Sequence, residues 1–542
     1  MAALEILPGD SLSLWVADRA APPVGAPVIE LQKGFAAMGI PLEVRTMAGL
    51  PPFEAILSKG EAAPKKTVPK PFVRQDPDAF EVDVSERSVR IRSLSRRGFS
   101  FSVWELMENL GWSWPTPEIA REPDPPPWTL PAGTATRDPA LAHRVFFAEQ
   151  IEIPPRLILW LSRHRFNTIF PGNPARFSDP ERQLPDSSLA MAKALGFDLI
   201  VGGDCAAWFA EAAGLSPEKN WSDWTRADLD KLMETVFAML QEMGDPIPRL
   251  SIWPTEGSEK TTAAFLRELS EKNPRLRFET SFRLAGELRG LGNTLFHVRD
   301  STLSPLASET EIEEWAKSNL GAEDGVDRYL LCHLSDWDGR LGRTVAPLLW
   351  RRLRRRVRLA CEAGMAGAGI GLSSLESTSF LERSGFSLAI ASRAMWSGAA
   401  WDPDSFAREI VQDQFDAAGK VVLGLAEDFE RWVEQASAQS ETLANGHGSS
   451  IRFASEVIPD ENIRDKIDQR ISEIEESAPF ETCIELARAL STLVSLYDLE
   501  ECTDKHEAKA LARTIWRNNV MDRWPGWLQE SSPLAERLRG FL

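Results

Sequence analysis

The chain is 542 residues long, and single hydrophobic cores stop growing at about 250–300 residues, so several domains are expected. A composition of 43% hydrophobic and 26% charged residues is ordinary for a folded protein, and the net charge of −19 argues against nucleic acid as a partner. The five cysteines show no CxxC or CxxH spacing, and the N-terminus has neither a basic start nor a long apolar run. We therefore expect no zinc site, no disulfide framework, no transmembrane segment and a cytoplasmic location.

Residues 1–117 predict a small α+β accessory domain. Its elements are expected as strands at 11–17, 41–47, 80–84 and 88–94 and as helices at 28–38 and 97–110. Residues 118–139 follow with a high density of proline, which removes backbone donors and restricts the residue before it. This segment is predicted to be a linker.

Residues 140–400 alternate between strand-like and helical patterns, which predicts an α/β fold with a parallel sheet and crossover helices. The expected strands are 144–148, 168–170, 198–202, 249–253, 277–280, 294–298, 329–333 and 367–371. The expected helices are 155–163, 187–195, 226–243, 261–272, 284–290, 309–320, 345–363 and 380–392. Eight such units indicate a (β/α)8 TIM barrel, and the rival open sheet has no GxGxxG fingerprint to support it.

Residues 401–542 carry almost no strand signal and predict an all-α C-terminal domain. The helices are expected at 405–415, 421–437, 461–475, 480–497 and 505–518.

Three segments resemble glycoside hydrolases with a (β/α)8 barrel, namely the α-glucuronidases and β-N-acetylhexosaminidases. They are IRSLSRRGFSFSVWELMENLGWSWPTPE at 91–118, LILWLSRHRFNTIFPGN at 157–173 and FSLAIASRAMWSGAAWDPDSFAREIVQDQF at 386–415. The resemblance implies the same layout of accessory domain, barrel and helical domain, and it implies cleavage of an O-glycosidic bond.

Such cleavage needs two carboxyl groups about 5–10 Å apart. Glu256 follows the fourth predicted strand, and its Thr-Glu-Gly context resembles the Ser-Glu-Gly of α-glucuronidases, which implies the role of general acid. Asp300, after the sixth strand, is the preferred second carboxylate, and Asp336 and Asp338, after the seventh, are the alternative. Each of these carboxylates also fits a solvated turn or a helix cap.

The remaining candidates are expected to bind substrate at the rim where the strands end. Arg144, Arg165 and Arg299 offer guanidinium groups for the carboxylate of an acidic sugar, although buried salt bridges are an alternative. Trp253 and Trp337 are expected to stack on the sugar. Further substrate-binding candidates are His164, Asn167, Asp204, His297, His333 and Glu376. The three histidines lack tight ligand spacing, so neither a metal nor a cofactor is expected.

The sequence therefore predicts a glycoside hydrolase acting on a small oligosaccharide or glycoconjugate, and a uronic sugar fits the arginines. One alternative is a substrate-assisted enzyme resembling β-N-acetylhexosaminidases, in which the 2-acetamido group replaces the protein nucleophile. The other is a glycan-binding barrel without catalysis. A small carbohydrate is the expected partner, nucleic acid and membrane are not, and homo-oligomerisation is left open. The arginine-rich segment at 351–359 is expected to form an outer helix of the barrel with acidic neighbours.

Overall fold

The computed structural model describes most of the chain. The described residues are 3–17, 25–60, 72, 74–149, 153–171, 186–203, 210–211, 213–216, 224–242, 247–254, 257–288, 290–291, 293–299, 309–320, 326–333, 346–373, 378–398, 402–439, 460–477, 481–520, 538 and 540.

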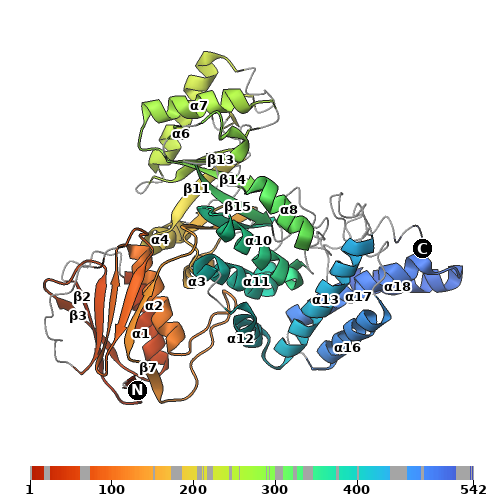
Figure 1. Cartoon of the computed structure of the whole chain (residues 1–542), viewed down its shortest axis with the longest axis horizontal. Coiled ribbons are helices and arrows are strands. Elements are labelled where there is room, and N and C mark those ends of the chain that lie inside the picture. Colours follow the sequence, from red (N-terminus) through yellow and green to blue (C-terminus); the bar gives the residue numbers. More distant parts are fainter. Residues whose placement is uncertain are drawn as a thin grey trace.

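The accessory domain is built on a six-stranded sheet whose order is β3-β2-β4-β6-β5-β8. Strand β2 pairs with β3 in parallel, and the other pairs are antiparallel. The strands are β2 (Leu12–Ala17), β3 (Leu42–Met47), β4 (Glu54–Lys59), β5 (Phe80–Val84), β6 (Ser88–Ser93) and β8 (Gly133–Arg137). Helices α1 (Gly25–Ala37) and α2 (Arg96–Asn109) lie between this sheet and the barrel (Figure 1).

Part of the segment expected to be a linker belongs to this domain. Strand β7 (Trp128–Pro131) pairs with β1 (Ala3–Ile6), and β8 pairs with β5 at the edge of the six-stranded sheet. The prolines that suggested a linker are concentrated before residue 128, and the threonine-rich stretch after it is free to extend and pair.

The centre of the molecule is a closed barrel of eight parallel strands in the order β10-β11-β12-β13-β14-β15-β16-β9, which confirms the predicted (β/α)8 fold. The strands are β9 (His143–Glu149), β10 (Thr168–Phe170), β11 (Asp198–Gly203), β12 (Arg249–Ile252), β13 (Phe278–Ser281), β14 (Thr294–Arg299), β15 (Asp327–His333) and β16 (Gly367–Ser373).

Helices cover the outside of the barrel. They are α3 (Pro155–Arg163), α4 (Asp186–Leu195), α6 (Arg226–Glu242), α7 (Glu259–Lys272), α8 (Glu309–Asn319), α10 (Trp350–Glu362) and α11 (Thr378–Ser397). The helix expected at 284–290 is wrong, because the described residues there form only a 3-10 turn, η4 (Phe282–Leu284). Glycine interrupts this stretch at Gly286 and Gly290, and Gly290 has a φ of +86° that a helix does not accept.

The barrel interior is a packed core rather than a pore. Alternate residues of the strands point inward, and the apolar members of this set are Val145, Phe147, Phe170, Ile200, Trp253, Leu295, Tyr329 and Leu331. A Cβ at Gly369 on β16 would lie 3.0 Å from the Val145 side chain and 3.2 Å from the Tyr329 ring. The eighth strand therefore makes room for the large side chains of its neighbours.

The C-terminal domain is helical throughout its described residues, as predicted. It consists of α12 (Pro403–Phe415), α13 (Gly419–Gln439), α16 (Glu461–Ser477), α17 (Glu481–Glu501) and α18 (Lys505–Val520). One apolar core joins it to the barrel, because Trp350 of α10 and Phe386 of α11 belong to the same cluster as Val411 and Trp432. The accessory and C-terminal domains flank the barrel on two sides (Figure 1).

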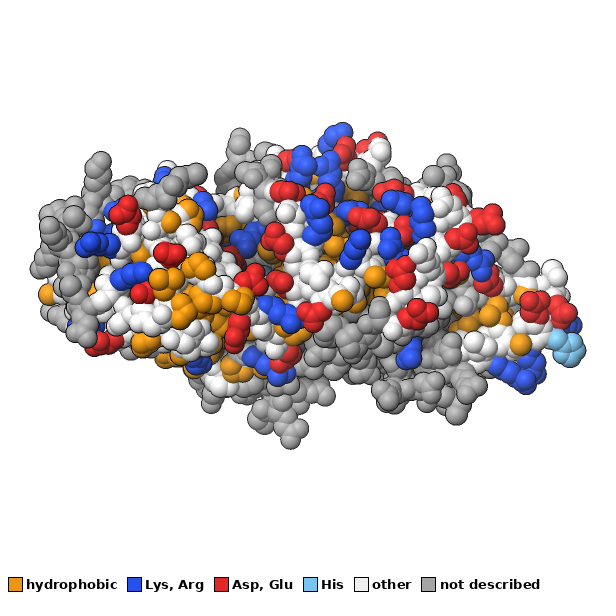
Figure 2. Space-filling model, turned by 90° about the horizontal axis from the view of Figure 1, so that it is seen from below, with side chains coloured by type: hydrophobic (Ala, Val, Ile, Leu, Met, Phe, Trp, Pro, Cys, Tyr) orange, Lys and Arg blue, Asp and Glu red, His pale blue; other side chains and the backbone are white. Residues whose placement is uncertain are grey.

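The arginines of α10 are paired with acidic neighbours. Arg351 contacts Glu427 and Glu430, and Arg355 contacts Glu313. On the face drawn in Figure 2, basic and acidic side chains are interspersed, and that face shows no continuous basic surface. Among the described residues, no helix is long and apolar enough to cross a bilayer.

Candidate functional site

The carboxyl ends of the eight barrel strands meet at one rim, which is where enzymes of this fold place their chemistry. The predicted carboxylates follow strands that end there, but all six of them lie outside the described residues, as does Trp337. The six are Glu256, Asp300, Asp336, Asp338, Asp204 and Glu376. His333 is the last residue of β15, and its side chain is likewise outside the described part.

Two predicted residues meet at the rim. Trp253 directly follows β12, Arg299 ends β14, and the guanidinium carbon of Arg299 lies 3.9 Å from the centroid of the Trp253 ring. Trp253 is only 9% exposed and packs against Phe147 and Phe170 as well. The indole therefore stacks on Arg299 and is too buried to offer an open face to a sugar.

Arg299 differs from the other predicted arginines in its partners. Within the described part of the chain it has no carboxylate partner, whereas Arg144 pairs with Asp78 and Arg165 with two glutamates of α2. A cation stacked on an indole keeps its hydrogen-bond donors available. The described partner of Arg299 at the rim is therefore an aromatic ring and not a carboxylate.

A buried carboxylate lies inside the barrel, on the strand between Trp253 and Arg299. Glu279 of β13 is 0% exposed. Its Oε1 atom accepts from Nδ1 of His297 at 2.6 Å and from the Tyr329 hydroxyl at 3.0 Å. Its Oε2 atom accepts from Nε1 of Trp253 at 3.0 Å and from the Ser251 hydroxyl. Four donors from three other strands thus converge on one carboxylate.

The electrostatics of this cluster favour an ionised Glu279. Burial by itself would raise the pKa of Glu279, but the charge of His297 and the hydrogen bonds from His297, Ser251 and Trp253 outweigh it and lower the pKa. Burial and the neighbouring carboxylate raise the pKa of Tyr329 well above its usual value, so its hydroxyl stays protonated and donates.

Glu279 was not among the predicted site residues, because those were chosen at the ends of strands and not in their interiors. In the strand sequence RFETS at 277–281, successive side chains alternate between the two faces of the sheet. Phe278 packs on the outer face, under the helices. Its neighbour Glu279 must then point into the barrel, where a charged residue is unusual.

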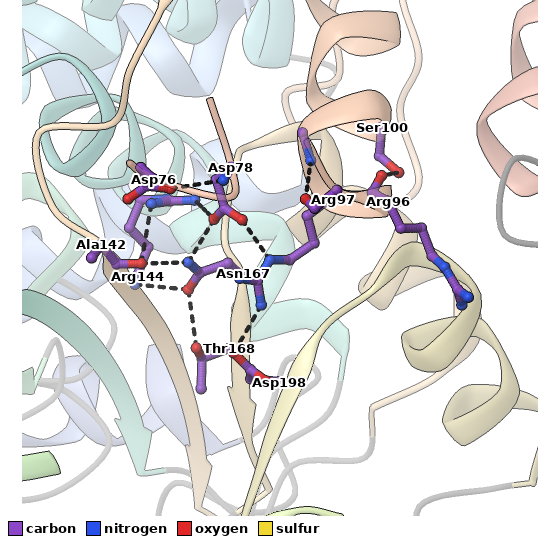
Figure 3. A network of polar contacts seen from close by, with 12 residues as sticks. Asp76, Asp78, Arg96, Arg97, Ser100, Ala142, Arg144, Asn167, Thr168 and Asp198 are labelled. Carbon is purple, nitrogen blue, oxygen red and sulfur yellow. Dashed lines mark hydrogen bonds and ion pairs between the residues drawn. The ribbon is translucent and has the colours of Figure 1, made fainter. Parts of the chain in front are cut away.

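Four of the predicted substrate-binding residues lie at the opposite, amino end of the barrel. Arg144 is the second residue of β9, and its Nη2 atom donates to Asp78 of the accessory domain at 2.6 Å. Asn167, just before β10, donates to the same carboxylate at 2.8 Å. Arg97 of α2 links Asp78, at 2.6 Å, to Asp198 at the start of β11, at 2.8 Å (Figure 3).

His164 and Arg165 continue this interface. The Nε2 atom of His164 lies 2.7 Å from the carbonyl oxygen of Trp114, and burial lowers the pKa of His164 to about 4. Arg165 pairs with Glu105 at 3.2 Å and Glu108 at 2.7 Å, both on α2.

The structure therefore does not bring Arg144, His164, Arg165 and Asn167 to the rim. They lie near the starts of strands instead of following their ends, and each of them is hydrogen-bonded to the accessory domain or to nearby backbone. Residues at this face of a TIM barrel serve stability. Within the described residues, no group of three or more histidines, cysteines and acidic residues could hold a metal ion.

Comparisons with known proteins add the following. No protein-family model matches the chain, and no curated protein matches it. A solved structure named "Structure of CpGH84D" is similar over 99% of this chain and 92% of that chain, with 11% sequence identity and a TM-score of 0.49. The barrel assignment rests on the strand pairing of this chain itself.

Proposed function

We propose that the protein is a glycoside hydrolase that cleaves an O-glycosidic bond in a small oligosaccharide or glycoconjugate. Glu256 is the general acid in this proposal, and Asp300 is the second carboxylate. The observation that supports it is the contact between Trp253 and Arg299 at the rim. Glu256 comes three residues after Trp253, and Asp300 directly follows Arg299.

The spacing of the strands fits this pair of carboxylates. Neighbouring strands lie about 4.8 Å apart, so β12 and β14, with β13 between them, end about 10 Å apart. Glycosidases place their two carboxyl groups about 5–10 Å apart across the scissile bond. Asp336 and Asp338 follow β15, which is one strand further from β12, and are therefore the second choice.

The substrate in this proposal carries a negative charge, as a uronic acid does. Of the three arginines that the sequence offered for a carboxylate, Arg144 pairs with Asp78 and Arg165 with Glu108 at the amino end. Arg299 is the one at the rim, and its planar fork suits bidentate pairing with a carboxylate.

The test is hydrolysis of a panel of aryl glycosides that includes uronides, neutral hexosides and N-acetylhexosaminides. We expect turnover of a uronide and a loss of about 10²–10⁴-fold in Glu256→Gln, the usual contribution of a general acid. Glu259→Gln, in the first turn of α7, is the matched control and should retain activity. Unchanged turnover in Glu256→Gln would remove that residue from the role.

The panel also separates the alternatives. Cleavage confined to N-acetylhexosaminides would favour the substrate-assisted mechanism, and sugar binding without turnover of any glycoside would favour a non-catalytic barrel. Arg299→Met should raise KM for the uronide while leaving KM for a neutral hexoside unchanged. An equal change for both substrates would exclude recognition of the charge by Arg299.

A further inference from the structure

The Glu279 carboxylate lies in the barrel interior, whose buried apolar side chains include Phe147, Leu295 and Leu331. No part of Glu279 reaches solvent. Taking a carboxylate out of water costs several kcal/mol, and a well-packed apolar residue at such a position is often equally stable or more stable. Packing alone therefore gives no reason for a charge at this position.

Two of the groups that hydrogen-bond to Glu279, the Trp253 indole and the His297 imidazole, connect it with the rim. Trp253 donates to it through Nε1 and carries Arg299 on its ring. His297 lies two residues before Arg299 on the same side of β14, and its ring centroid is 5.0 Å from that of Trp253. Because Nδ1 of His297 is bonded to Glu279, Nε2 is the ring nitrogen left for another partner.

We propose that Glu279 is a positioning residue, which holds the His297 ring through Nδ1 and directs its Nε2 atom toward a substrate group beside Arg299. This role rests on the proposed hydrolase function in one respect only, the identity of the substrate. The chemistry of the pair itself, a buried carboxylate that fixes the tautomer and orientation of an imidazole, is independent of it.

Within the described residues, Glu279 is the carboxylate that contacts His297. Tyr329 on β15 keeps its proton, because burial and Glu279 raise its pKa, although Arg249 on β12 and Arg299 on β14 oppose that rise. Glu279→Gln would remove the negative charge beside the imidazole and keep the size of the side chain.

A test that needs no substrate is the titration of His297 by NMR in protein labelled with ¹³C-histidine. The chain has six histidines, so the His297 signal can be assigned from its absence in His297→Gln. We expect the His297 signal to titrate at least about one pH unit lower in Glu279→Gln than in the wild-type protein, because the mutation removes the negative charge beside the ring. Tyr329→Phe removes a neutral donor from the same carboxylate and should leave the titration nearly unchanged.

The wild-type protein alone can overturn the proposal, even where Glu279→Gln fails to fold. ¹⁵N chemical shifts that place the proton of a neutral His297 on Nε2 and not on Nδ1 would exclude donation from Nδ1 to Glu279. Equal titration in wild type and in folded Glu279→Gln would show that the carboxylate does not control the imidazole.

Activity provides the second measurement. The kcat/KM profile should shift in Glu279→Gln by the same number of pH units as the NMR titration of His297. A mutant that lowers kcat/KM equally at all pH values would indicate a structural role only. If the NMR titration moves as expected but no glycoside is cleaved, the proposed hydrolase function fails while the pairing of Glu279 with His297 stands.

Discussion

Replacement of Asp78 tests the interface between the accessory domain and the barrel most directly. Its carboxylate accepts from Arg97 and Arg144 at 2.6 Å each and from the Asn167 amide at 2.8 Å. Asp78→Asn keeps the size of the side chain but removes its charge and one acceptor. We expect a clear loss of stability, because two buried guanidinium groups then share too little negative charge.

The size of this loss follows from the contacts that remain. Breaking a buried ion pair by removing one partner costs about 3–5 kcal/mol, since the other charge stays buried. Arg144 is 0% exposed, so water cannot replace Asp78. However, Arg144 keeps its bonds to the carbonyl groups of Leu141 and Arg165, and Arg97 keeps its ion pair with Asp198. We therefore expect about 3 kcal/mol, at the lower end of that range.

The assay is urea unfolding at neutral pH followed by tryptophan fluorescence, with limited proteolysis of the native protein to detect local release of the accessory domain. Asp83→Asn is the matched control, because Asp83 accepts an exposed hydrogen bond from Thr134 and should change stability by less than about 0.5 kcal/mol. An equally small effect of Asp78→Asn would refute the reasoning.

The same variant has a pH signature. Burial opposes the charged form of Asp78, but Arg97 and Arg144 outweigh it and lower the pKa. Such a group stabilises the fold above its unfolded pKa of about 3.9, and the contribution is lost as pH falls through the lowered native value. The acid limb of stability should therefore be flatter in Asp78→Asn than in the wild type.

Two further predictions concern pH. Burial lowers the pKa of His164 to about 4, so its contribution is present above about pH 6.5 and is lost on acidification, with about 2 kcal/mol gone at about pH 5. His164→Gln should reduce the difference in urea midpoint between neutral pH and about pH 5, and an unchanged difference would contradict a neutral buried imidazole. Burial raises the pKa of Glu430 to about 7 despite the nearby Arg351 and Arg352, so protonated Glu430 favours the fold at low pH and this contribution is lost as pH rises through about 7. Glu430→Gln should make the thermal midpoint less sensitive to pH between about 6 and 8, and the same sensitivity in both proteins would refute the assignment.

The barrel was predictable because its signal is local. Period-two alternation and the helices between strands gave all eight strands, and the structure moves their ends by at most two residues, as at β15 and β16. The helical C-terminal domain followed from the same kind of pattern. Strand β8 was not found, because its identity depends on pairing with β5, about fifty residues earlier in the chain.

The site was harder to predict, because the role of a side chain depends on distant partners. Arg144 and Arg299 both lie on strands and both suited a carboxylate ligand. Only the fold reveals that Arg144 meets Asp78, 66 residues away, whereas Arg299 lies on an indole. Glu279 was within reach of sequence reasoning, since alternation alone directs it inward, but its four donors come from three other strands.

The attachment of the accessory domain at the amino end of the barrel has a practical consequence for redesign. The residues that fasten it, including Asp78 and Arg97, belong to no rim loop. Loops that follow β12 or β14 can accordingly be exchanged or lengthened without cutting the bonds that keep the two domains together. The scaffold thus suits libraries of loop variants screened for new specificities.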